Sequence, residues 1–135
     1  MLLVDTNVLL AAADRSSPDH QRCASLLDVR TDIAVPTTGA TECAWMVESR
    51  LGPVAEAAFV RSIASGELPT IELLPEDWAR CADLIETYHD LGLGVVDASL
   101  IAVAERLGQQ VIATLNRRDF AVVRPAHTAA FELIP

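Results

Sequence analysis

The chain has 135 residues, of which 51% are hydrophobic, and a formal net charge of −9 at pH 7. A chain of this length can bury one well-filled core but is too short for two ordinary domains. The acidic balance argues against a protein that holds nucleic acid by charge alone, since such binding depends on many lysines and arginines. A nuclease remains compatible with it, because part of the excess acid can belong to a metal site.

Short apolar runs alternate with helical patterns along the chain, which indicates an α/β fold. Strands are expected at Leu2 to Val4, in DIAVP up to Pro36, in LPTIEL and in QVIATL, with FELIP as a further edge strand. Helices are expected from VLLAAAD onward, over about 19–27, from TTG to about Arg50, in AEAAFVRSIAS, from Pro75 to about His89, and over about 96–107. Strands separated by helices predict a central, mostly parallel sheet flanked by helices, with functional groups at the carboxyl ends of the strands.

Neither a membrane span nor a signal peptide is indicated. No apolar stretch approaches the ~18 residues of a spanning helix, and MLLV lacks the basic segment and the length of a signal peptide. We therefore expect a cytoplasmic protein. The three cysteines, Cys23, Cys43 and Cys81, form no C-x-x-C pair and are expected to be buried small hydrophobes.

Four acids follow an apolar run or lie on an apolar helical stripe: Asp5, Glu42, Asp97 and Asp119. An ionised carboxylate beside a packed core is unfavourable unless a cation or hydrogen bonds compensate it. Hard divalent ions such as Mg²⁺ and Mn²⁺ prefer oxygen ligands, and Mg²⁺ is commonly held by a few carboxylates, water and substrate phosphate. The pattern therefore predicts one metal site suited to phosphodiester hydrolysis.

Each acid also has a purely structural explanation. Asp5 can cap a helix, Glu42 can complete a first-turn cap with Thr38 or Gly39, and Asp97 can favour the positive end of a helix dipole. Two features favour the shared site. Leu100, Ile101 and Ala104 follow Asp97 at helical spacing, and Trp45 and Met46 follow Glu42 in the same way, so that both acids are expected at the start of a buried stripe.

The ordered motifs LLVDTNVLLAA, ATECAW, LGVVDASLIAVAERLG and VIATLNRRDF, followed by VRP and FELIP, resemble those of PIN-domain ribonucleases, and more narrowly of VapC-type toxins from bacterial toxin–antitoxin pairs. The set runs the length of the chain, so the resemblance implies a single PIN domain over 1–135. By position it implies that Asp5, Glu42 and Asp97 are metal ligands. It also implies hydroxyl residues near the site at Thr6 and Thr114.

One position departs from the family pattern. An acid often stands where this chain has Asn116, which offers a carbonyl oxygen but no charge. Asp119 is the alternative for this fourth acidic role, either as a ligand or as a neighbouring group, although it can equally cap the turn before Phe120. Arg117 and Arg118 lie in the same loop and are candidates for steering substrate phosphates, with solvated loop charges as the competing explanation.

The resemblance implies metal-assisted hydrolysis of RNA by Mg²⁺, with Mn²⁺ able to substitute, and no side-chain nucleophile. It further implies a homodimer and a cognate VapB-type antitoxin. Two other interpretations of the sequence remain. A haloacid-dehalogenase-type phosphatase needs an acid two residues after Asp5, where this chain has Asn7. A non-catalytic PIN-like module that binds RNA or protein is the stronger alternative, because of Asn116. Which RNA would be cut does not follow from the sequence.

Overall fold

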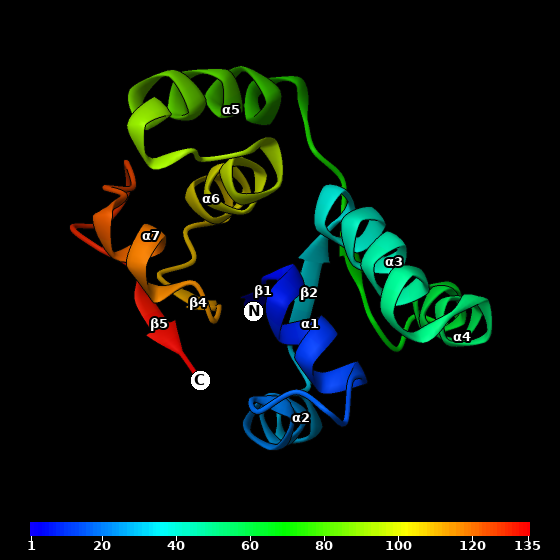
Figure 1. The fold of residues 1–135 in the computed structure, drawn as a ribbon. Coiled ribbons are helices and arrows are strands. Elements are labelled where there is room, and N and C mark those ends of the chain that lie inside the picture. Colours follow the sequence, from blue (N-terminus) through cyan, green and yellow to red (C-terminus); the bar gives the residue numbers. More distant parts are fainter.

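The computed structural model describes residues 1–135 and contains one five-stranded sheet in the order β3-β2-β1-β4-β5, with every neighbouring pair parallel (Figure 1). The strands are β1 (Leu2–Val4), β2 (Ile33–Pro36), β3 (Thr70–Ile71), β4 (Val111–Ala113) and β5 (Glu132–Ile134). The helices are α1 (Thr6–Ala13), α2 (His20–Val29), α3 (Thr37–Leu51), α4 (Pro53–Ala64), α5 (Pro75–Thr87), the short 3-10 helix η1 (His89–Leu91), α6 (Val95–Leu107) and α7 (Arg117–Val122). The predicted α/β class and parallel sheet are confirmed.

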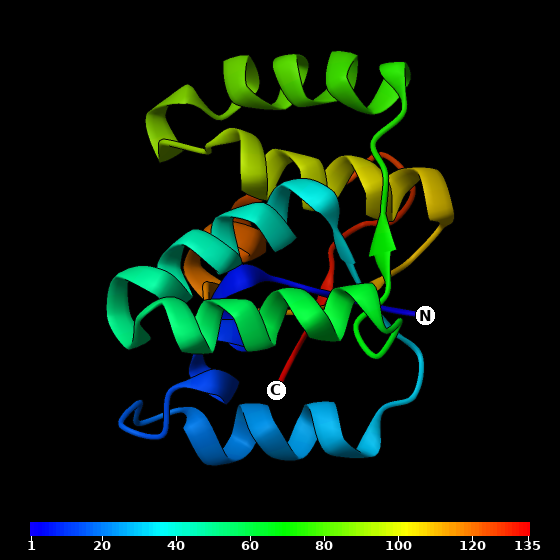
Figure 2. The same ribbon diagram turned by 90° about the vertical axis from the view of Figure 1, so that its right-hand side faces the viewer.

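Helices cover both faces of the sheet, and the side chains of β1 alternate between them. Leu3 packs in a core with α5, α6 and α7, whereas Leu2 and Val4 pack in a second core with α1 to α4. Figures 1 and 2 show these two helical layers on either side of the strands. Burial of β1 on both faces explains why its sequence is a continuous apolar run rather than an alternating one.

The carboxyl ends of the central strand β1 and its neighbour β4 meet at one edge of the sheet. Val4 of β1 is in register with Ala113 of β4, and the Asp5 amide donates a 2.9 Å hydrogen bond to the Ala113 carbonyl oxygen. The residues that follow these strands, Asp5 and Thr114, are both buried. This junction is the point from which the functional site is built.

Most expected elements are present, with three differences. Residues 117–122 form α7, where a loop was expected, because Asn116 caps this short helix through the backbone amide of Asp119. The strand expected in LPTIEL is confined to Thr70–Ile71. Trp45 is 67% exposed rather than part of a buried stripe, since the inward face of α3 consists of other residues, namely Ala40, Cys43 and Val47.

The cysteines behave as expected, because Cys23, Cys43 and Cys81 are all buried and free. None of the helices combines the length and the apolar character needed to cross a bilayer.

Candidate active site

Asp5 lies between the end of β1 and the start of α1, where it is 5% exposed. Its Oδ1 accepts a 2.8 Å hydrogen bond from the Thr6 amide, and its Oδ2 accepts bonds of 2.8 Å from Thr114 Oγ1 and 3.0 Å from Asn7 Nδ2. These bonds favour the ionised form, but burial outweighs them and raises the pKa of Asp5. Asp5 therefore caps α1, as its purely structural explanation predicted, and its carboxylate is also fixed in orientation.

Asp97 is the third residue of α6 and is partly buried. Burial, and to a lesser extent the charges of Asp5, Glu42 and Asp119, together raise the pKa of Asp97 to about 7. A carboxyl group that responds to three other acids must share their surroundings. The structure brings Asp5, Glu42 and Asp97 together around one cleft, whereas Asp119 lies outside it and affects Asp97 through its charge.

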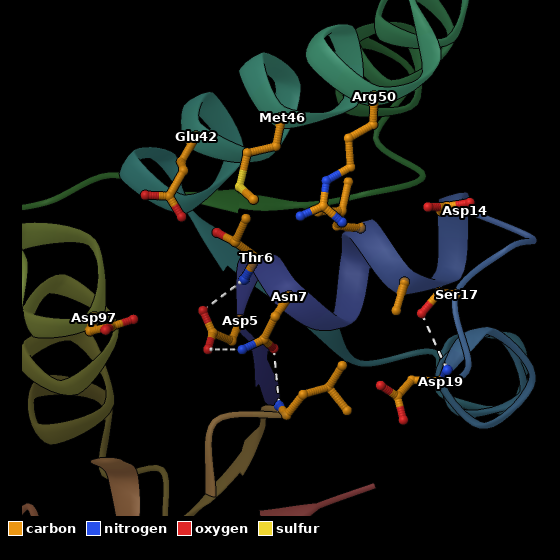
Figure 3. Close-up of a pocket in the computed structure, with 13 residues that line it drawn as sticks. Asp5, Thr6, Asn7, Asp14, Ser17, Asp19, Glu42, Met46, Arg50 and Asp97 are labelled. Atoms are coloured by element: carbon orange, nitrogen blue, oxygen red, sulfur yellow. Dashed lines mark hydrogen bonds between the residues drawn. The ribbon is translucent and has the colours of Figure 1, made fainter. Parts of the chain in front are cut away.

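Glu42 belongs to the second turn of α3, beyond the first-turn position that a cap requires. The cap explanation for this residue is therefore wrong. Figure 3 shows Glu42, Asp5 and Asp97 around the same opening, each carried by a different element. A hydroxyl contact of 2.5 Å between Thr38 of α3 and Ser99 of α6 joins the two helices that carry Glu42 and Asp97.

Thr6 connects α1 to α3 through a 3.3 Å hydrogen bond from its hydroxyl to the Gly39 carbonyl oxygen. Little space surrounds Gly39 at this point, since an added Cβ would lie 3.3 Å from Val35 Cγ2 of β2 and 3.6 Å from Thr6 Oγ1. The predicted hydroxyl residue thus fixes the helix that carries Glu42 and does not itself bond to a carboxylate through its side chain.

The opening is a cleft of about 290 Å³ whose acids are Asp5, Asp14, Asp19, Glu42 and Asp97. Its carboxylate oxygens form the donor set that a hard divalent ion prefers. As the side chains stand, no three acidic, histidine or cysteine groups are arranged to hold an ion together. The cleft therefore fits such an ion by its chemistry and charge, while coordination would require side-chain rotation.

Asn116 and Asp119 pair with each other at the start of α7. Asn116 Nδ2 donates a 2.9 Å hydrogen bond to Asp119 Oδ2, and Asn116 Oδ1 accepts a 3.3 Å bond from the Asp119 amide. The other carboxylate oxygen, Asp119 Oδ1, is buried without a hydrogen-bond partner, although Arg118 Nε lies 3.4 Å away. Neither residue lines the cleft. Asp119 acts on the site in this structure through its charge.

Arg117 and Arg118 are not loop residues but the first residues of α7, and both are exposed. Arg117 donates to the Pro135 carbonyl oxygen, and Arg118 pairs with Asp119. They do not line the cleft that contains Asp5 and Asp97. The expectation that they flank the site on its own loop is corrected accordingly.

Sequence reasoning missed Asn7 and Arg50 as cleft residues. Asn7 donates to Asp5 Oδ2 and accepts a 3.0 Å hydrogen bond from the Leu115 amide, so it joins the ends of β1 and β4. Its place two residues after Asp5, in the first turn of α1, was the available signal. Arg50 lines the cleft from the last turn of α3. Its spacing of eight residues from Glu42 on one helix was the corresponding signal.

Comparison with known proteins identifies the class of fold to which this site belongs. The family model for the PIN domain matches residues 2–124. The chain belongs to the PIN-domain family, and within that family to the VapC ribonucleases. The second assignment rests on Ribonuclease VapC26 of Mycobacterium tuberculosis (strain ATCC 25618 / H37Rv), which is 30% identical over 135 residues that cover 99% of this chain and 100% of that relative. The resemblance inferred from the motifs is confirmed.

Solved structures agree with this fold. The crystal structure of VapC20 from Mycobacterium tuberculosis, described as a sarcin-ricin loop cleaving toxin, superposes with a TM-score of 0.83 and 15% identity over 96% of this chain and 99% of that one. VapBC2 from Rickettsia felis, bound to a DNA fragment from its promoter, gives a TM-score of 0.70 and 16% identity over 99% and 98% of the two chains.

Proposed function

We propose that this chain is a divalent-metal-dependent endoribonuclease, formed by a single PIN domain over 1–135, that acts as the toxin of a bacterial toxin–antitoxin pair. The observation that carries the proposal is the gathering of Asp5, Glu42 and Asp97 around one cleft, where burial and then the charges of neighbouring acids raise the pKa of Asp97 to about 7. Such a surplus of negative charge is what a bound divalent cation would neutralise. Membership among the VapC ribonucleases gives the reaction class.

Asp5, Asp97 and Glu42 would hold the ion, with Mg²⁺ as the expected metal and Mn²⁺ as its substitute. Such an ion supplies Lewis-acid chemistry that lowers the pKa of water and polarises a phosphoryl oxygen. The protein's own contribution is orientation and charge. Thr114, Asn7 and the Thr6 amide fix the Asp5 carboxylate, and Asp97, whose pKa is raised, would release its proton on holding a cation.

The proposed partners are RNA as substrate, a VapB-type antitoxin and a second copy of the chain, and the proposed location is the cytoplasm. Support for the antitoxin comes from structural neighbours that are such complexes, among them a toxin–antitoxin complex from Klebsiella pneumoniae with a TM-score of 0.66. In cells, expression of this chain alone should arrest growth, and co-expression of the antitoxin should restore it. Harmless expression of the folded chain would contradict the toxin assignment.

A non-catalytic PIN-like binding module is the second candidate, because Asn116 stands where the family often has an acid and is engaged by Asp119. Incubation of the purified chain with total RNA separates the two. The nuclease should produce discrete new RNA ends with Mg²⁺ or Mn²⁺ and none with EDTA. Binding of RNA without any cleavage in either metal would favour the module. Sequencing of the new ends identifies the RNA that is cut.

A further inference from the structure

Arg50 is the one basic residue among the thirteen that line the acidic cleft. It projects from α3 toward α1, and Met46 separates it from Glu42 on the same helix (Figure 3). Glu42, Met46 and Arg50 recur every four residues and therefore share the helix face that borders the cleft. A single cation in a cleft lined by five acids needs an explanation.

The side chain of Arg50 has no partner within the protein. It takes part in no ion pair and no hydrogen bond, a condition shared among the arginines only with Arg15 and Arg61. Of these three residues, only Arg50 lines the cleft. All the donors of its guanidinium are thus available at the place where the substrate would approach.

The acids nearest this end of the cleft each accept hydrogen bonds from other groups through one carboxylate oxygen, Oδ1. Asp14 accepts hydrogen bonds of 2.9 Å from the Ser16 amide and 2.6 Å from the Ser16 hydroxyl. Asp19 accepts bonds of 2.9 and 2.6 Å from the guanidinium of Arg22. Arg50 forms no hydrogen bond or ion pair with either acid, although its charge contributes to the lowered pKa of Asp14 and both acids lie within the same cleft.

We propose that Arg50 binds a backbone phosphate of the RNA at a position beside the scissile one, an inference that rests on the proposed nuclease function. Eight residues of helix place it about 12 Å from Glu42 along the α3 axis, too far to serve the reacting phosphate directly. The planar guanidinium suits bidentate binding of phosphate. In a chain of net charge −9, a cation inside the cleft offsets the repulsion that the acids exert on the strand.

The test compares Arg50→Ala and Arg50→Lys with Arg61→Ala, which removes an exposed and equally unpaired arginine outside the cleft. Cleavage of one fluorescent RNA is measured at saturating Mn²⁺ over a series of salt concentrations. Arg50→Ala should raise KM roughly 5- to 10-fold and flatten the dependence of log KM on log salt by about 0.7 to 1, as loss of one phosphate contact requires. Its kcat should stay within about twofold. Arg50→Lys should give a KM and a salt dependence between those of Arg50→Ala and the parent chain. Arg61→Ala should give the values of the parent chain.

Two results would overturn the assignment of Arg50. An Arg50→Ala variant with the KM and salt dependence of Arg61→Ala would show that Arg50 contacts no phosphate. A variant whose Mn²⁺ affinity rises while its salt dependence is unchanged would show that Arg50 serves as an internal counter-charge. In both cases the parent still cleaves RNA, so the nuclease proposal survives. Absence of cleavage by the parent chain instead overturns the nuclease proposal and the role of Arg50 with it.

Discussion

Thr114 donates a 2.8 Å hydrogen bond to the Asp5 carboxylate across 109 positions of the sequence. The contact exists because β1 and β4 are neighbours in the sheet and each ends one residue before the pair. The same hydroxyl oxygen accepts a 3.0 Å bond from the Asn116 amide, so it ties the end of β4 to the capped start of α7. One buried threonine thus orients the central carboxylate and the segment that holds Asp119.

Replacement of Thr114 by valine should lower divalent-metal affinity by roughly 10- to 100-fold, because a group that orients a ligand is lost. It should also reduce the free energy of unfolding by about 1–3 kcal/mol, since the Asn116 amide loses its acceptor. Calorimetric titration with Mn²⁺ and thermal melts measure both effects. Thr114→Ser keeps the hydroxyl and should retain most of the affinity. Equal losses in the two variants would mean that the methyl group, and not the hydroxyl, matters.

Asn7→Ala should impair cleavage and stability together, since Asn7 bonds both Asp5 Oδ2 and the Leu115 amide. The expected loss of stability is about 1–3 kcal/mol, the usual effect of an unpaired amide in a partly buried place. Asn7→Asp should lower the apo melting temperature further, because a second carboxylate would lie against Asp5. Added Mn²⁺ should recover part of that difference. If Asn7→Ala melts and cleaves like the parent, Asn7 has no role in holding Asp5.

The raised pKa of Asp97 predicts how the apo protein responds to pH. Its value is about 7 in the folded chain against an ordinary 3.8, so between these values the folded state holds a proton that the unfolded chain releases. The free energy of unfolding should therefore fall as pH rises from about 4 to 7. In Asp97→Asn this fall should be smaller, with the remainder due to Asp5, whose pKa is also raised. Identical profiles for parent and variant would contradict the raised pKa of Asp97.

The Asn116–Asp119 contact predicts a non-additive double mutant. Asn116→Asp places a second carboxylate against Asp119 Oδ2, where the amide now donates at 2.9 Å, and this should weaken the apo protein while lowering the metal concentration needed for cleavage. Asp119→Ala should then reduce the activity of the parent more than that of the Asn116→Asp background, because either acid can supply the charge. Effects that add to within about 0.5 kcal/mol would show that the two positions do not share a role.

Much of the fold could be predicted because its signals are local. The apolar run of β1, the proline that begins α5 and the glycine that ends α6 each mark an element within a few residues. The helix α7 escaped notice because it has six residues and depends on the Asn116–Asp119 contact. The exposed position of Trp45 depends on which face α3 turns to the sheet, and helical spacing alone does not decide this.

The acids of the site could also be singled out, since a carboxylate beside an apolar run is conspicuous in any sequence. Thr6 and Thr114 were expected near the site from the family resemblance, but the hydrogen bonds that support the acids could not be predicted. Which strand lies beside β1 is a property of the whole chain, so the bonds from Thr114 and Asn7 that hold Asp5 and join β1 to β4 can be recognised only in the folded structure. The position of Arg50 in the cleft is likewise visible only there, because a cation in the last turn of a helix ordinarily indicates only favourable interaction with the helix dipole.

The proposed metal site is tested most directly by Asp97→Asn, measured for Mn²⁺ binding and RNA cleavage on the same preparation. Asp97 accepts no hydrogen bond within the protein, whereas an Asp5→Asn change would set an amide among donors that now bond a carboxylate. Asp97→Asn should therefore hold or raise the apo melting temperature, lose most stabilisation by Mn²⁺, and reduce cleavage by at least about 100-fold. A variant that melts like the parent, binds Mn²⁺ equally and cleaves RNA at a similar rate would contradict a metal centre built on Asp5, Glu42 and Asp97.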